Sequence, residues 1–285
     1  MWIIFALLNP LSEAIRSLIS KKTSERVDPL IIAWFNYFLP FFLFVPGLFF
    51  IELKFSYTFW QAVIISGLIN LTATVFYNKA LAFGNISSVM PMLSFTPLFM
   101  LVTSPILIGE FPNIYGLLGI ILIVSGSYLL NFKSIKNGIF TPFKSLIKNK
   151  GTRYMLFVAF IWSISANFDK ISIKSSSVYQ HLIFINVVVF SLMSLLLYAK
   201  SRFNIKIILE NKKNLLLISG LAVSSFIFHM VALSLTLVAY VIALKRLSGL
   251  LSVFFGYYFL KEEGIKERLL GATCMFFGVA LIVLS

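Results

Sequence analysis

The sequence predicts an all-α integral membrane protein, with ten transmembrane helices arranged as two inverted five-helix repeats. Three observations lead to this fold class: an extreme apolar composition, ten apolar segments of membrane-spanning length, and a match between the two halves of the chain. Of the 285 residues, 59% are hydrophobic and 12% are charged, whereas soluble domains contain about 25% charged residues. A soluble or disordered chain is therefore excluded. Cys274 is the only cysteine, which excludes a disulfide framework.

The apolar segments follow from the length that a bilayer requires, about 20 mainly apolar residues for each helix. They are 2–20, 30–51, 57–82, 86–108, 113–132, 154–174, 179–199, 214–235, 238–260 and 266–284. The run from Leu117 to Val124 shows no alternation of apolar and polar residues, so helices are favoured over the strands of a barrel. No basic region precedes the first segment and no small-residue cleavage site follows it, so we expect a retained helix instead of a signal peptide.

The net charge of +14 is unevenly distributed over the loops. With ten spans, most of the 24 Lys and Arg residues fall on one membrane face, in or beside the loops near 20–28, 83–85, 133–153, 200–213 and 261–265. The opposite face holds Lys54, Lys174 and both chain termini. The positive-inside rule then predicts that the basic loops are cytoplasmic and that both termini lie outside. No nucleic-acid motif surrounds the basic residues, so nucleic acid is not an expected partner.

An internal match divides the chain into a first repeat over 1–132, a basic connecting loop over 133–153 and a second repeat over 154–285. Residues 76–129 align with 228–281 without a gap. The matched pairs include Glu110 with Glu262, Gly119 with Gly271, and Gly126 with Gly278. Because each repeat has an odd number of spans, the second copy takes the opposite orientation in the membrane. Inverted repeats of this kind are typical of secondary transporters, whose substrate site lies near the midplane.

The two copies differ in their prolines. Segment 86–108 contains Pro91, Pro97 and Pro105, whereas the matching positions of 238–260 hold Ala243, Gly249 and Tyr257. Proline removes a helix hydrogen bond and favours a kink, so we predict that the first copy bends more. The matched glycines lie seven residues apart, about two helical turns, which predicts close packing of helices. Glu110 and Glu262 each precede the next helix, and we expect them to cap its N-terminus.

Ionisable side chains inside apolar segments are costly in a bilayer and indicate a functional site. Glu13 and Arg16 lie three residues apart on one face of the first segment. Asp169 and Lys170 lie near the outer end of the sixth segment. For each pair, the interpretations are a cavity role, a structural ion pair, or a basic side chain that snorkels to the interface.

Lys245 and Arg246 are central in the ninth segment, where neither side chain easily reaches an interface. Neighbouring helical positions point about 100° apart, so we expect one to face the cavity and the other a carboxylate. The uncharged candidates for the cavity are Tyr77, Asn78, Asn167 and His229. For His229, the alternatives are a proton carrier and a hydrogen-bonded packing residue.

Catalytic motifs are absent from the sequence. It contains no HExxH, GxSxG, P-loop or dinucleotide motif, and no paired set of Cys and His. We therefore expect no enzyme activity, no cofactor, no metal site and no energy from bound ATP.

Several runs are similar to a known family. The first half contains Tyr77 to Gly84 (YNKALAFG), then Val89-Met90-Pro91 and Gly109-Glu110. The second half contains Tyr240 to Ser248 (YVIALKRLS), then Leu260-Lys261-Glu262, and Asp169-Lys170 precedes both. In this order the runs resemble the EamA-like branch of the drug/metabolite transporter superfamily over nearly the whole chain. The resemblance implies alternating access and a cavity lined by spans 1, 3, 4, 6, 8 and 9. Many bacterial relatives keep their termini in the cytoplasm, whereas the lysines here predict the opposite.

The leading hypothesis is a secondary transporter of a small polar metabolite in the plasma membrane, which is the inner membrane of a bacterium. The basic excess inside the spans favours an anionic or zwitterionic substrate, such as an amino acid. One alternative is an exporter of cationic or hydrophobic drugs, and another is a membrane protein that handles lipid without transport. The expected partners are a small-molecule substrate and the lipid bilayer. The sequence does not decide between a monomer and a homodimer.

Overall fold

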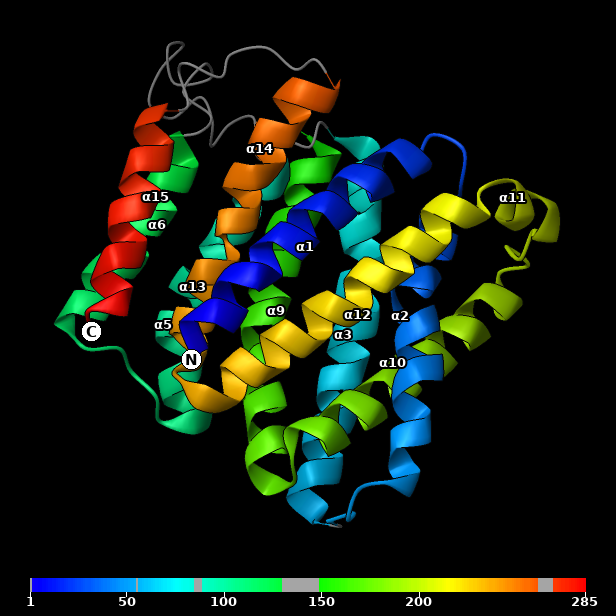
Figure 1. The fold of residues 1–285 in the computed structure, drawn as a ribbon, viewed down its shortest axis with the longest axis horizontal. Helices are drawn as coiled ribbons and strands as arrows, with labels where there is room; N and C mark the ends of the chain where they lie inside the picture. Colours follow the sequence, from blue (N-terminus) through cyan, green and yellow to red (C-terminus); the bar gives the residue numbers. More distant parts are fainter. Residues whose placement is uncertain (1, 55, 85–88, 130–148, 261–268) are drawn as a thin grey trace.

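The structure, a computed structural model, describes residues 2–54, 56–84, 89–129, 149–260 and 269–285, and no strand occurs among them (Figure 1). The helices of the first half are α1 (Trp2–Thr23), α2 (Pro29–Phe44), η1 (Val45–Phe49), α3 (Tyr57–Phe83), η2 (Met90–Ser94), α5 (Phe95–Ile108) and α6 (Ile114–Leu129). Those of the second half are α9 (Lys150–Ser175), α10 (Val178–Ala199), α11 (Ile205–Glu210), α12 (Lys212–Leu235), α13 (Val238–Lys245), α14 (Leu247–Leu260) and α15 (Leu269–Val283). Glu262 and most of the loop 133–153 lie outside the described residues.

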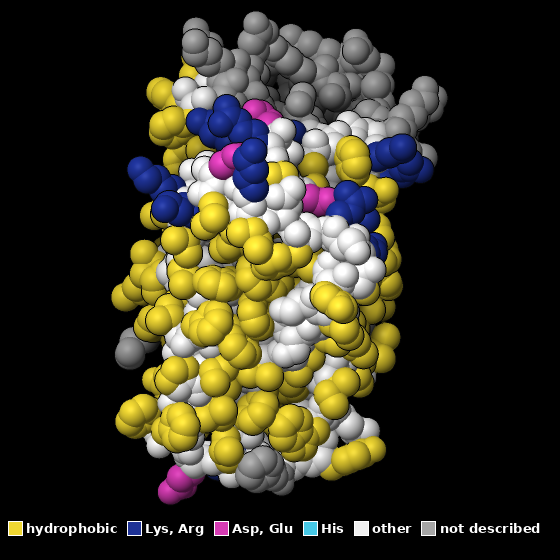
Figure 2. Space-filling model, turned by 90° about the vertical axis from the view of Figure 1, so that its right-hand side faces the viewer, with side chains coloured by type: hydrophobic (Ala, Val, Ile, Leu, Met, Phe, Trp, Pro, Cys, Tyr) yellow, Lys and Arg dark blue, Asp and Glu magenta, His cyan; other side chains and the backbone are white. Residues whose placement is uncertain are grey.

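The all-α fold is confirmed for the residues that the structure describes. Six helical segments, those of α1, α2 with η1, α3, α9, α10 and α12, are long and apolar enough to cross a membrane. Shorter apolar helices cover Met92–Ile108, Ile114–Gly126 and Thr273–Val283. Figure 2 shows a broad hydrophobic band across one face of the molecule, with Lys and Arg gathered above it. The Asn113 amide donates to the Ser285 carbonyl at 3.0 Å, which places the last residue beside the start of α6.

Side chains at the helix starts supply the hydrogen bonds that the first turn lacks. Asp28 accepts from the Leu30 N–H at 2.8 Å, and Ser56 accepts from the Phe59 N–H at 3.1 Å. Asn149 and Ser177 do the same for α9 and α10. Such caps stabilise a helix by about 1 kcal/mol, so they fix where the long helices begin.

The helix is interrupted both in segment 86–108, which contains the prolines, and in the matching segment 238–260, which has none. The sequence did not lead us to expect an interruption in the second segment. In the first copy η2 gives way to α5, and Pro97 lies in the first turn of α5, where a missing N–H costs little. In the second copy α13 ends at Lys245, and the Arg246 N–H bonds the Ala243 carbonyl at 3.0 Å. The Arg246 Nε donates a hydrogen bond to the Ile242 carbonyl at 3.2 Å. A side chain has therefore replaced the backbone donor in the helical ladder, so the helix breaks without proline.

Helix contacts run mostly between the halves. The helix α1 packs on α12 and α14, and α9 packs on α3 and α5. The helices α2 and α10 contact each other, α2 also contacts α12, and α10 also contacts α3. At one side of the molecule, α6 and α15 form a separate close pair (Figure 1).

The pair α6–α15 confirms the prediction of glycine-mediated packing. A Cβ built on Gly119 would lie 2.6 Å from the Gly278 carbonyl oxygen, and one on Gly278 would lie 2.7 Å from the Gly119 oxygen. A Cβ on Gly126 would lie 2.5 Å from the Gly271 oxygen. The two helices are antiparallel at this contact, and their backbones approach too closely for any larger residue.

Candidate functional site

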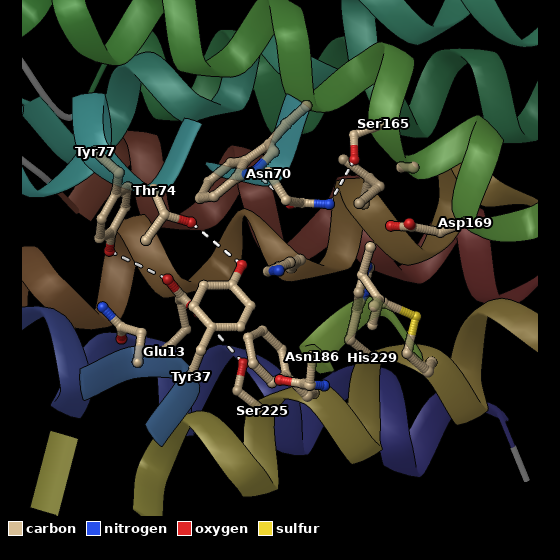
Figure 3. A pocket seen from close by; sticks show the side chains of 18 of the residues that line it. Glu13, Tyr37, Asn70, Thr74, Tyr77, Ser165, Asp169, Asn186, Ser225 and His229 are labelled. Atoms are coloured by element: carbon tan, nitrogen blue, oxygen red, sulfur yellow. Dashed lines mark hydrogen bonds between the residues drawn. The ribbon is translucent and has the colours of Figure 1, made fainter. Parts of the chain in front are cut away.

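A polar cavity lies at the centre of the molecule, between the two halves (Figure 3). Its walls come from α1, α2, α3, α9, α10, α12 and α13, together with Arg246. Its volume is about 70 Å³, and by this measure one water molecule needs about 10–15 Å³. In this conformation the cavity therefore has room for a small polar molecule only.

One wall is built around the carboxylate of Glu13. The Arg16 guanidinium bonds Glu13 Oε1 at 2.5 Å, and the Tyr77 hydroxyl donates to the same oxygen at 3.1 Å. Ser225 donates to Oε2 at 3.3 Å, and Arg16 also bonds the Asn36 side chain. The structural ion pair considered for Glu13 and Arg16 therefore exists, and it forms part of the cavity wall.

The opposite wall holds Asp169, whose carboxylate accepts from the Ser66 hydroxyl. The Asn70 amide joins this group, because its Nδ2 donates to Ser66 at 3.0 Å and to Ser165 at 2.7 Å. The Trp162 indole N–H donates to Asn70 at 3.2 Å. Figure 3 shows Asn70, Ser165 and Asp169 on the far side of the cavity from Glu13.

Lys245 and Arg246 both line the cavity together with Glu13 and Asp169, and neither forms an ion pair with a carboxylate among the described residues. The helix ends between them, and the 100° spacing of a regular helix no longer applies. Within the described residues, the Lys245 ammonium contacts only the Trp162 ring, 5.7 Å from its centroid. The terminal nitrogens of Arg246 make no hydrogen bond to any residue that the structure describes. Two cationic groups therefore reach the cavity with donors unused.

Two buried polar atoms at the cavity are also without partners in the described part of the chain. They are Asn186 Oδ1 and His229 Nδ1. The Asn186 Nδ2 donates to the Leu182 carbonyl at 2.7 Å, which directs the amide oxygen away from the helix ladder. Unpaired buried polar atoms are rare and costly in folded proteins. Because both residues line the cavity, these atoms are available to bond a polar ligand there.

Three predicted cavity residues lie elsewhere. Lys170 neither lines the cavity nor snorkels, since its ammonium bonds the carbonyls of Leu233 at 2.5 Å and Thr236 at 2.7 Å, at the end of α12. Asn167 joins α9 to α5 through Ser104 at 2.8 Å. Asn78 donates to its own helix at Thr74, 2.9 Å away. Lys170 therefore serves the end of α12, Asn167 joins two helices, and Asn78 bonds the backbone inside α3.

Glu110 is a structural residue, but it caps a different helix from the one expected. Its Oε2 accepts from the Val238 N–H at 3.2 Å, at the start of α13, and its Oε1 pairs with Lys174 at 3.1 Å. The following helix α6 is capped by Asn113, which accepts from the Gly116 N–H at 2.9 Å. Pro91 lies in η2, and its side chain is outside the described ones.

Sequence reasoning missed the contributions of α2 and α10, and the span-4 lining that the family resemblance implied is not seen among the described residues. Two signals point to the missed residues. Asn36 and Asn186 are each the only Asn of an apolar segment, and a buried amide requires partners. The other signal, for Asn70 and Thr74, is a polar stripe at helical spacing along α3 that also contains Ser66 and the predicted Tyr77.

Comparisons with known proteins agree with this architecture. The model of the EamA-like transporter family matches residues 1–132 and 149–284. A solved crystal structure is similar to the chain with a TM-score of 0.72 and 14% sequence identity, over 99% of this chain and 97% of that one, which shows a shared fold. No curated protein matches the sequence. Because the family model covers most of both halves, the chain belongs to the EamA-like transporter family.

Proposed function

We propose that this chain is a secondary transporter that moves a small anionic or zwitterionic metabolite by alternating access between two inverted five-helix halves. The observation that carries the substrate class is the pair Lys245 and Arg246, which reach the central cavity with unused donors. Carboxylates and similar anions form strong charge-assisted hydrogen bonds with such groups.

The helix contacts support the inverted repeat. In the predicted repeat, α1, α2, α3, α5 and α6 of the first half correspond to α9, α10, α12, α14 and α15 of the second. The contact between α1 and α12 then corresponds to that between α9 and α3, and the contact between α1 and α14 to that between α9 and α5. Likewise, the contact between α2 and α12 corresponds to that between α10 and α3. The contacts α2–α10 and α6–α15 each join two corresponding helices. An approximate two-fold axis in the membrane plane produces this pattern. A cavity on such an axis is suited to opening toward either face.

The cavity also bears on the rival function, export of cationic drugs. That function favours a cavity dominated by acidic and aromatic groups. Among the described residues, the basic cavity residues are Arg16, Lys245 and Arg246, and the acidic ones are Glu13 and Asp169. Arg16 already neutralises Glu13, so the remaining balance favours an anion.

Uptake of a metabolite panel into proteoliposomes tests the proposal. The panel contains small carboxylates, zwitterions and cationic drugs, and we expect transport of carboxylates or zwitterions only. Lys245→Gln removes a charge-assisted contact of about 1.5–3 kcal/mol, so apparent affinity falls about tenfold or more. Lys79→Gln is the matched control, because Lys79 also lies over an aromatic ring, 5.5 Å from the Phe76 centroid, but does not line the cavity. Equal transport by the two variants contradicts the assignment.

A further inference from the structure

Asp169 and His181 form a pair at the cavity wall that the proposed substrate site does not use. The distance from His181 Nε2 to Asp169 Oδ1 is 3.5 Å. Asp169 is 5% exposed and lines the cavity, and His181, in the first turns of α10, is fully buried. A titratable pair inside a membrane protein with one member open to a cavity indicates a site for a mobile charge.

The surroundings of Asp169 differ from those of Glu13. Glu13 bonds Arg16, whereas no Lys or Arg of the described residues lies within ion-pair distance of Asp169. In the described part of the chain its neighbours are a hydroxyl and an imidazole group, those of Ser66 and His181. An unpaired buried charge costs several kcal/mol, and a bound proton removes that cost. The pair is therefore built to take up a proton.

The geometry holds His181 ready for this role. Its Nδ1 is 2.9 Å from the Ser172 hydroxyl, which orients the ring so that Nε2 faces Asp169. Nε2 itself makes no hydrogen bond in the described structure. The neighbouring Gln180 bonds the backbone N–H and carbonyl of Lys54 at 2.9 and 2.8 Å. The residues before α3 are thus tied to the start of α10, and the pair meets the cavity through Asp169, which lines it.

We propose that Asp169 and His181 form the proton-binding site that couples solute movement to a proton gradient. The coupling rests on the proposed transport function. A proton from cavity water binds the Asp169 carboxylate, is shared with His181 Nε2, and returns to water when the cavity opens to the other face.

The other charged and titratable groups at the cavity determine the direction of coupling. They are Glu13, Arg16, Tyr37, Tyr77, His229, Lys245 and Arg246. The unpaired cations Lys245 and Arg246 disfavour an added proton, and an anion bound to them cancels that repulsion. Solute and proton therefore bind with positive linkage and move in the same direction.

Infrared difference spectroscopy tests proton binding without any transported solute. We expect a protonated carboxyl C=O band in purified, lipid-reconstituted protein that disappears as pH is raised. Asp169→Asn removes this band, His181→Gln shifts the pH at which it titrates, and Glu52→Gln, which changes an exposed carboxylate, leaves it unchanged. If Asp169→Asn does not fold, Ser66→Ala shifts the titration instead. Absence of the band, or its persistence in Asp169→Asn, overturns the site.

Proteoliposomes with a trapped pH-sensitive dye test the coupling with the same metabolite panel. Uptake by the unmodified protein acidifies the lumen. Asp169→Asn loses both acidification of the lumen and accumulation of the solute. Uptake without acidification by the unmodified protein overturns the coupling. If no solute of the panel moves while the infrared band titrates, the proposed function fails and the proton site stands.

Discussion

Two contacts join the halves of the molecule, and they are built from opposite kinds of residue. Between α6 and α15, glycines bring the backbones so close that a single methyl group has no space. Around the central cavity, by contrast, Lys245, Asn186 and His229 leave donors or acceptors without partners in the described structure. The first contact is filled by the two backbones, whereas the second keeps polar atoms without partners in the described structure. A transporter needs both, since one part of the interface must hold while another exchanges partners.

The largest effect is expected at the glycine contact. Gly119→Leu places its side chain against the backbone of Gly278, 2.6 Å from Cβ, and neither helix yields without separation of the pair. We expect the free energy of unfolding to fall by more than about 4 kcal/mol, which is seen as aggregated protein in size-exclusion chromatography. Gly220→Leu in α12 is the control, because nothing lies within 4 Å of a Cβ there. Equal melting temperatures for the two variants refute the close contact.

The next effect is expected at the cavity wall. Glu13→Gln leaves Arg16 buried without its counter-charge, so we expect a loss of about 3 kcal/mol in thermal unfolding of detergent-solubilised protein. The double variant Glu13→Gln with Arg16→Gln recovers part of this loss, because no buried charge remains unpaired. A single variant as stable as the unmodified protein means that the pair does not support the wall.

A smaller effect is expected where α6 begins. Asn113→Ala removes the acceptor for the Gly116 N–H and the bond to Ser285. We expect a loss of about 1 kcal/mol in the same unfolding assay, with transport unchanged. Asn113→Asp retains the acceptor for the Gly116 N–H but not the donor to Ser285, and it is expected to lose less stability than Asn113→Ala. A transport defect in Asn113→Ala at normal stability contradicts the separation of the two contacts.

The smallest effect is expected for Lys174→Ala, which breaks the ion pair with Glu110. The Lys174 side chain is 58% exposed, so the pair contributes about 0.5 kcal/mol or less. Glu110→Ala loses more, since it also uncaps α13 at Val238. If the two variants are equally stable, the cap has no energetic role.

The sequence predicted the helical segments and the glycine contact because both follow from local composition and spacing. It also identified the charged members of the cavity, since charges inside apolar segments have few interpretations. It did not predict that Lys170 binds the end of α12 or that Glu110 caps α13, because these contacts depend on which helix ends meet across the halves. The break at Arg246 was missed for a different reason, since a side chain replaces a backbone donor there.

The glycine contact has a consequence for biosynthesis. The helix α6 leaves the ribosome before any helix of the second half, whereas its partner α15 follows all of them. Until then the glycine face of α6 lies against lipid, where it gains little from packing with acyl chains. Insertion of α15 covers this face with a partner helix. A chain stopped before α15 therefore presents an unfilled small-residue surface, which membrane quality control has a physical means to recognise.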